Sequence, residues 1–134
     1  MSSPIFVSNM AAVGVAINAA ALKAMIAAGD VGRNTTVKNL RNVPARTGNP
    51  GIVPDTKVKY TMSAPGEYPA LATARLRDSI QRRVVGGEVQ VGTAVEYGIK
   101  LEKESPSKGG RPWLKRSLDE AKPAMLAKIA QRWF

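Results

Sequence analysis

The chain has 134 residues, a length that suits one domain with a modest core, and 44% of them are hydrophobic, as in an ordinary globular fold. It carries 20 Lys and Arg against 10 Asp and Glu, which gives a formal net charge of +10 and a pI of about 10.3. This excess favours a polyanionic partner such as DNA, or the acidic face of another protein. A solvated cationic surface without any partner is the alternative.

The sequence lacks both Cys and His. The first absence excludes disulfides and thiolate metal sites, and the second removes the commonest general base near neutral pH. Glu102 and Glu104 are two residues apart and do not share a helix face, so they indicate a solvated acidic patch rather than a hydrolytic pair. No phosphate-binding loop or metal-ligand motif is present. We therefore expect a protein that is not an enzyme and needs no cofactor, metal or small-molecule substrate.

Residues 10–28 are apolar except for Asn18 and Lys23, and this length approaches that of a membrane span. Nine of these residues are Ala, which is weakly hydrophobic, and Lys23 would be costly inside a bilayer. No basic segment precedes the run, as it would in a signal peptide. We expect no membrane association.

The same run predicts a helix that Ser8 caps and that Gly29 ends or kinks. Its apolar residues fall into two stripes, so the helix needs cover on more than one side, either from a neighbouring subunit or from its own domain. The first stripe comprises Val13, Ile17, Ala20 and Ala24, and the second comprises Val15, Leu22 and Ile26.

Residues 31–69 are rich in Pro and Gly and predict a long loop or arm, with a short helical piece at 35–41. Val58, Tyr60 and Met62 alternate with polar residues, which is typical of a half-buried strand. We expect this arm to become ordered on assembly. Its basic residues, offset before residue 60 only by Asp55, are Arg33, Lys38, Arg41, Arg46, Lys57 and Lys59.

The remaining chain predicts a helix, a hairpin and two more helices. Leu76 and Ile80 lie four apart on a short helix that Thr73 caps, and Gly86-Gly87 predicts the turn of a β-hairpin. Tyr97 and Leu101 indicate another short helix. A C-terminal amphipathic helix, kinked or restarted at Pro123, is predicted by the stripe Leu114, Leu118, Ala121, Met125, Ile129 and Trp133.

Five motifs in this sequence resemble, in the same order, those of the HK97 gp10-like family of tailed-phage proteins. Residues 43–48, VPARTG, are similar to the family's aPvRTG, and residues 63–70, SAPGEYPA, with 76–80, LRDSI, are similar to its SAPGEPPA and LR.SI. Residues 89–93, VQVGT, resemble V.VGT; Tyr97 with Leu101-Glu102 resembles Y…LE; and residues 111–114, RPWL, resemble RPFL. The similarity covers about residues 43–122, and departs from the family at Thr73-Ala74 and Lys103.

This resemblance implies an α+β fold with a small antiparallel sheet packed against a long N-terminal helix and a C-terminal helix, with a long basic loop. It also implies a structural virion protein of the head–tail neck, a tail-completion or tail-terminator subunit without catalytic residues. Pro65-Gly66 and Pro69 would fix a turn, Arg111 would offer its planar fork to a carboxylate such as Glu102, and Trp113 would anchor the sheet edge. Simple packing within one subunit is the alternative for these residues.

We thus expect one domain, 1–134, divided into an Ala-rich helix (1–30), a basic arm with a strand (31–69) and a helix-hairpin-helix core (70–134). Its partners would be further copies of itself in a ring, with six-fold symmetry, and other neck and tail proteins, after assembly in the host cytoplasm. The candidate interface residues are Val15, Leu22, Ile26, Arg41, Arg46, Lys57, Lys59, Tyr97, Glu102, Arg111 and Trp113.

A non-specific DNA-binding protein that uses the basic segment 31–59 is the alternative function. Aromatic residues are few and no base-reading motif is present, so contacts would be made to phosphates without sequence preference. The candidate phosphate contacts are Arg33, Lys38, Arg41 and Arg46.

Overall fold

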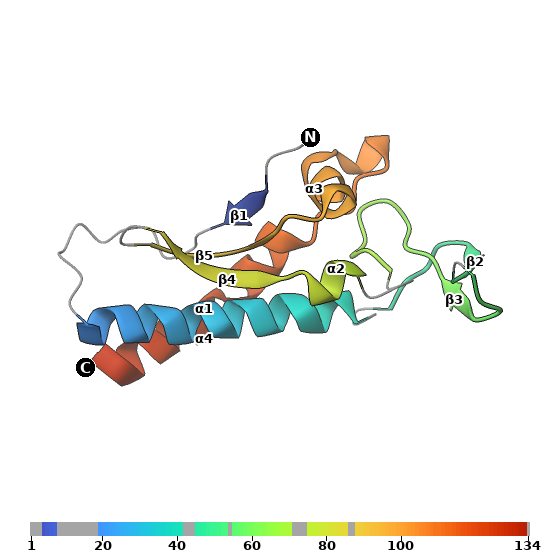
Figure 1. Cartoon of the computed structure of the whole chain (residues 1–134). Coiled ribbons are helices and arrows are strands. Elements are labelled where there is room, and N and C mark those ends of the chain that lie inside the picture. Colours follow the sequence, from blue (N-terminus) through green and yellow to red (C-terminus); the bar gives the residue numbers. More distant parts are fainter. Residues whose placement is uncertain are drawn as a thin grey trace.

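The computed structural model describes residues 4–7, 19–41, 45–53, 55–70, 75–85 and 88–133. The fold is α+β, with two long helices against a small antiparallel sheet, as predicted (Figure 1). Its elements are β1 (Ile5–Val7), α1 (Ala19–Leu40), β2 (Pro50–Ile52), β3 (Lys59–Thr61), α2 (Arg75–Asp78), β4 (Gln81–Val85), β5 (Glu88–Thr93), α3 (Glu96–Lys103), the 3-10 turn η1 (Pro106–Lys108) and α4 (Leu114–Trp133).

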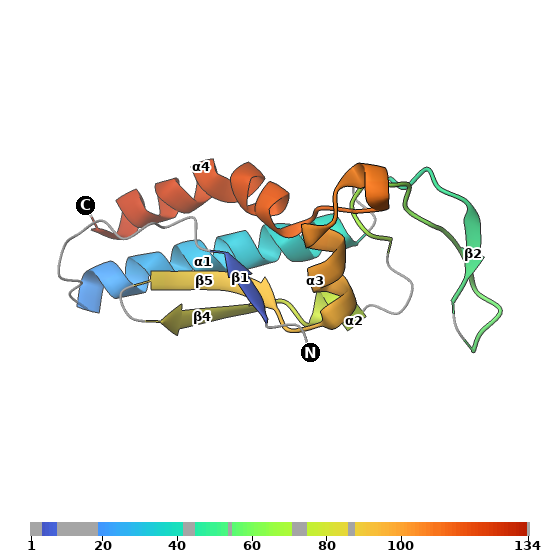
Figure 2. The same ribbon diagram turned by 90° about the horizontal axis from the view of Figure 1, so that it is seen from above.

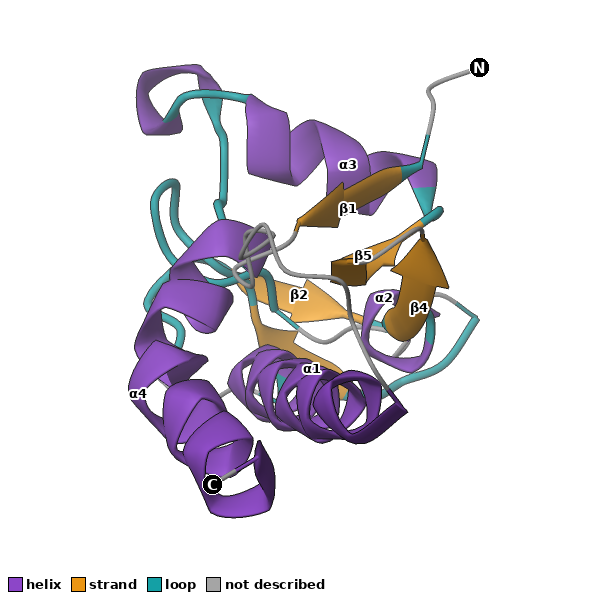
Figure 3. Cartoon of the chain, turned by 90° about the vertical axis from the view of Figure 1, so that its left-hand side faces the viewer, coloured by secondary structure: helices purple, strands orange, loops and turns teal. Residues whose placement is uncertain are grey.

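Helices α1 and α4 lie side by side, and the sheet that contains β4 and β5 lies over α1 (Figures 1 and 3). The predicted stripe of the C-terminal helix is confirmed from Leu114 to Ile129, because Leu114, Leu118, Ala121 and Met125 are buried and Ile129 is half-buried. The side chain of Trp133 lies outside the described part. Pro123 lies inside α4 without restarting it. No helix among the described residues has the length and apolar character that a membrane crossing requires.

Of the stop or kink predicted at Gly29, the stop is wrong, because α1 continues through Gly29 and Gly32 to Leu40. A Cβ on Gly29 would lie 2.6 Å from Cγ1 of Val89, and one on Gly32 would lie 2.8 Å from Cδ2 of Leu118. Both distances are shorter than van der Waals contact allows. These glycines therefore let α1 pack closely on β5 and α4, at the cost of helix propensity.

The sheet has the order β1-β5-β4, with both neighbouring pairs antiparallel. The hairpin of β4 and β5 is confirmed, with Val85 opposite Glu88, while its turn residues lie outside the described part. Strand β1 was not predicted, and it pairs Phe6 with Gly92. A side chain at Gly92 would collide with the backbone of Ile5, so Gly92 makes room for this strand.

The core has two parts. The first surrounds Trp113, which is completely buried, and the second lies between the α1, α4 and β5 contact surfaces. Ile26, a predicted interface residue, packs against the second part within its own chain. The first contains Leu40, Tyr68, Leu76, Ile80, Val91, Trp113, Leu114 and Leu118, and the second contains Met25, Ala28, Val89, Ala121 and Met125.

The predicted arm is shorter than expected, because residues 31–40 belong to α1. Residues 48–62, here called the arm, form a two-stranded antiparallel hairpin that pairs Ile52 with Lys59. The strand predicted around Tyr60 is confirmed, although its neighbours Val58 and Met62 are 60% and 40% exposed. Figure 2 shows this hairpin projecting from one end of the helical body.

Candidate functional site

Arg46 holds the base of the arm to the helical body. Its side chain is only 8% exposed, and its guanidinium donates from Nε and Nη2 to the carbonyl of Pro69 and from Nη2 to the carbonyl of Asn39. Burial lowers the pKa of this guanidinium. The prediction that Arg46 contacts a partner or DNA phosphates is therefore corrected, because its guanidinium donates to carbonyl groups inside the chain.

Glu67 ties the incoming and outgoing chain segments of the arm together. Its carboxylate accepts hydrogen bonds from the backbone N–H and the hydroxyl of Thr47, at 3.0 and 2.7 Å, and from the backbone N–H of Ala64 at 2.7 Å. These bonds favour the ionised form and lower the pKa of Glu67 to about 2, with the Ala64 amide the largest cause. Glu67 thus joins the two chain segments at the base of the arm.

Acid should loosen this tie. The pKa of Glu67 is about 2 in the folded chain, against an ordinary value of 4.5 when the fold is lost. The stabilising effect of its ionised carboxylate is therefore complete above pH 4.5 and disappears as the pH falls toward 2. We expect Glu67→Gln to lower the urea midpoint at pH 7, with the difference from the unmodified chain shrinking between these pH values. Glu96→Gln, at an exposed carboxylate, is the control and should show no such convergence. A Glu67→Gln difference that stays constant down to pH 2 would contradict the assignment.

Arg111 makes a second tie on the other side of the arm base. Its Nη2 donates to the carbonyl of Ser63 at 3.0 Å, and its Nη1 donates to the carbonyl of Gly109 at 2.7 Å. The backbone N–H of Gly66 donates to the carbonyl of Gly110 close by. The expected pairing of Arg111 with Glu102 is wrong, because the fork binds backbone carbonyls instead.

Glu102 instead caps α4 from a distance. Its Oε2 accepts hydrogen bonds from the backbone N–H groups of Trp113 and Leu114, at 2.9 and 2.6 Å, and its Oε1 accepts one from Lys115 at 3.3 Å. A carboxylate here satisfies free amides of the first helical turn and opposes the positive end of the helix dipole. Glu102 is therefore a structural cap in this chain, a role that the sequence did not predict.

Trp113 links α3 to the start of α4. Its ring is fully buried, and Nε1 donates to the carbonyl of Gly98 at 2.9 Å. Gly98 leaves room for the Leu76 side chain, which would have to shift if residue 98 carried a Cβ. Trp113 belongs to the core of its own subunit, so its assignment to an interface is corrected.

Buried polar side chains next to Arg46 complete the junction, the name used here for the region where α1, the arm base and α4 meet. Nδ2 of Asn39 donates to the hydroxyl of Tyr68, to Oγ of Ser117 and to the carboxylate of Glu120. The Arg116 guanidinium lies over the Tyr68 ring, 4.3 Å from its centre, a favourable cation–π geometry. Burial raises the pKa of the Tyr68 hydroxyl, so it remains neutral in these contacts. The cluster joins α1, the arm base and α4.

The other predicted interface residues do not form one surface. Lys57 and Lys59 are exposed on the arm, Arg41 is exposed just after α1, and Leu22 is half-buried on α1. Val15 lies outside the described residues. Tyr97 is 43% exposed on α3, although its hydroxyl accepts the backbone N–H of Leu76. The basic segment 31–59 is likewise divided between α1, the junction and the arm.

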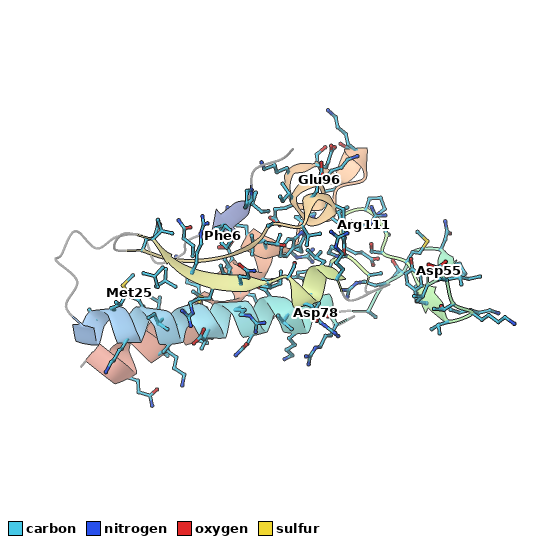
Figure 4. All side chains as sticks on the ribbon, in the orientation of Figure 1. Phe6, Met25, Asp55, Asp78, Glu96 and Arg111 are labelled. Carbon is cyan, nitrogen blue, oxygen red and sulfur yellow. The ribbon has the colours of Figure 1, made fainter. Side chains whose placement is uncertain are left out.

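Sequence reasoning missed the roles of Glu67, Asn39 and Glu102. Their partners lie 3 to 81 residues away along the chain, and most of the contacts depend on the tertiary fold. The SAPGE and RPWL motifs were nevertheless a signal, because they contain Glu67 and Arg111. Figure 4 shows Arg111 on the side of the helical body from which the arm, marked by Asp55, projects.

The described residues contain no group of three His, Cys, Asp or Glu side chains placed to hold a metal ion. The described residues form ordered turns, an arm that hydrogen bonds hold at its base, and an exposed apolar surface. Reactive side chains do not converge among these residues. No protein-family model, curated protein or solved structure matches the chain.

Proposed function

We propose that this chain is a non-enzymatic structural subunit of a tailed-phage virion, a neck, tail-completion or tail-terminator protein that assembles into a six-fold ring and joins tail to head. It would be assembled in the host cytoplasm and would contact its own copies and other neck and tail proteins. The observation that carries the proposal is the series of five motifs, of which the first, second and last contribute contacts to the base of the arm. The proposed assembly element is the arm that this junction holds.

The motif residues are interdependent in space as well as ordered in sequence. Arg46 of the first motif binds the carbonyl of Pro69 in the second, and Arg111 of the last binds the carbonyl of Ser63. Ser79 of the second motif and Thr93 of the third share a hydrogen bond of 2.6 Å. Short matches whose residues contact one another in the fold are harder to attribute to chance than the same matches scattered over a surface.

The arm has the properties of a segment that needs a partner. Ile52 is 61% exposed and Val58 is 60% exposed, and Met62 adds a third apolar side chain. An isolated two-stranded hairpin is marginally stable in water, and exposed apolar groups of this kind gain free energy when a partner covers them. An anchored base with exposed apolar side chains along the arm suits a heterologous contact that repeats from one copy to the next and closes a ring.

Removing the apolar side chains of the arm tests this interface. We expect Ile52→Ser combined with Val58→Ser to abolish or weaken at least tenfold the self-association of the full chain, followed by sedimentation velocity over a concentration series. The thermal midpoint should change little, because both side chains are already exposed in the single chain.

The matched control replaces two exposed apolar side chains of the body, Val85→Ser with Leu126→Ser, which are 48% and 52% exposed. This variant should associate like the unmodified chain. Equal loss in both variants would assign the association to general hydrophobicity and reject the arm as the interface.

A further inference from the structure

We propose that the outer face of α1, together with its border on α2 and β4, binds the phosphate backbone of double-stranded DNA. This site goes beyond the structural role proposed above and does not depend on it. It also differs from the basic segment 31–59, because it excludes the buried Arg46 and the arm lysines. It is called the α1 face below and comprises Lys23, Arg33, Asn34, Lys38, Arg41, Arg77 and Arg82.

The helical repeat brings the α1 cations to one side. Lys23 and Lys38 are exposed on α1, 15 residues or about four turns apart, and Arg41 is exposed just after the helix ends. Asn34 lies on the same line, 11 residues after Lys23, and is also exposed. The opposite side of α1 packs on α4 and β5 through Gly32 and Gly29, so this face points away from the core.

The neighbouring elements extend the cationic character of the face. Nε of Arg33 donates to the carbonyl of Ile80, just before β4, which fixes its guanidinium at the border between the helix and the sheet. Arg82 of β4 bonds Asp30 of α1, and Arg77 of α2 bonds Asp78, both at 2.9 Å. Figure 4 shows Asp78 on the side of α2 that adjoins α1.

The charge of this face is largely uncompensated. It has six Lys or Arg side chains against two carboxylates, Asp30 and Asp78, so its net charge is +4. Both carboxylates are already in ion pairs. The side chains of Lys23, Lys38 and Arg41 make no hydrogen bond or ion pair with any described residue, which leaves their charges available to an external anion.

The shape of the face favours duplex DNA over other polyanions. Lys23 and Lys38 are about 22 Å apart along a straight helix, a length over which a DNA duplex presents about a dozen phosphate charges. No aromatic side chain belongs to this face, so it has no platform for stacking the bases of a single strand. Contacts would be made to phosphates and would carry no sequence preference.

The test measures how DNA affinity depends on salt for the full chain, with fluorescence anisotropy of a short mixed-sequence duplex. If Lys23, Arg33, Lys38 and Arg41 each neutralise one phosphate, affinity should fall about 150-fold between about 50 and 200 mM salt. In the triple variant Lys23→Gln, Lys38→Gln and Arg41→Gln the fall should be only about fourfold, because one such contact remains.

A charge-matched control removes three exposed lysines elsewhere, Lys57→Gln, Lys59→Gln and Lys108→Gln. It should keep the steep salt dependence of the unmodified chain. Equal effects of the two triple variants, or no binding to the duplex at about 50 mM salt, would overturn the proposal. Equal or tighter binding of the matching single strand or of polyglutamate would overturn it in favour of another anionic partner.

Discussion

Replacing Trp113 by Ala should destabilise the chain more than any other single truncation of the core. The indole is completely buried among residues of α2, α3 and α4, and Phe or Trp to Ala changes at such sites cost about 3–5 kcal/mol in free energy of unfolding. The carbonyl of Gly98 would also lose its hydrogen bond from Nε1. The thermal midpoint should fall by roughly 10 °C or more.

Trp113→Phe separates the two contributions. It retains most of the apolar volume but removes the N–H donor, so its cost should be about 1–3 kcal/mol. Leu126→Ala, at an exposed position of α4, is the control and should change the stability by about 0.5 kcal/mol or less. Urea unfolding at equilibrium measures all three variants. A Trp113→Ala cost no larger than that of Leu126→Ala would contradict the position of the ring.

Replacing Arg46 by Ala should detach the arm from the body. The change removes the hydrogen bonds to Asn39 and Pro69 and leaves their buried carbonyls without these donors. Charge-assisted bonds of this kind contribute about 1.5–3 kcal/mol each, so we expect a loss of about 3 kcal/mol. Arg46→Lys should rescue only part of it, because an ammonium cannot reproduce the planar fork.

Hydrogen exchange locates this effect. In Arg46→Ala the amides that close the arm base, those of Gly48 and Met62, should exchange faster, while amides in the middle of α4 should stay protected. Lys57→Ala, on the exposed arm, is the control and should leave both regions unchanged. Protection at Gly48 and Met62 that is independent of residue 46 would reject Arg46 as the support of the arm.

Local patterns were sufficient to predict most elements of the body. The spacing of Leu114, Leu118 and Met125 predicts α4, and the alternation of valines about Gly86-Gly87 predicts the hairpin of β4 and β5. These signals are reliable because the residues that form each element are close together along the chain.

The sequence did not predict features that depend on distant contacts. Gly29 has the usual chemistry of a helix end, but it is required where α1 approaches β5, and strand β1 has only three residues to signal its presence. Arg46 and Glu102 are charged residues that sequence reasoning places at a surface, and both are instead held by backbone groups far along the chain. Composition indicates how many charges a chain has, whereas the fold decides which of them are used internally.

We propose above all that the chain is a structural part of a tailed-phage neck. Quantitative mass spectrometry of nuclease-treated virions, purified from cells that carry the gene for the chain, tests it most directly. We expect its peptides to remain in intact particles at a copy number that matches one six-fold ring. Complete virions that lack the chain would contradict this proposal.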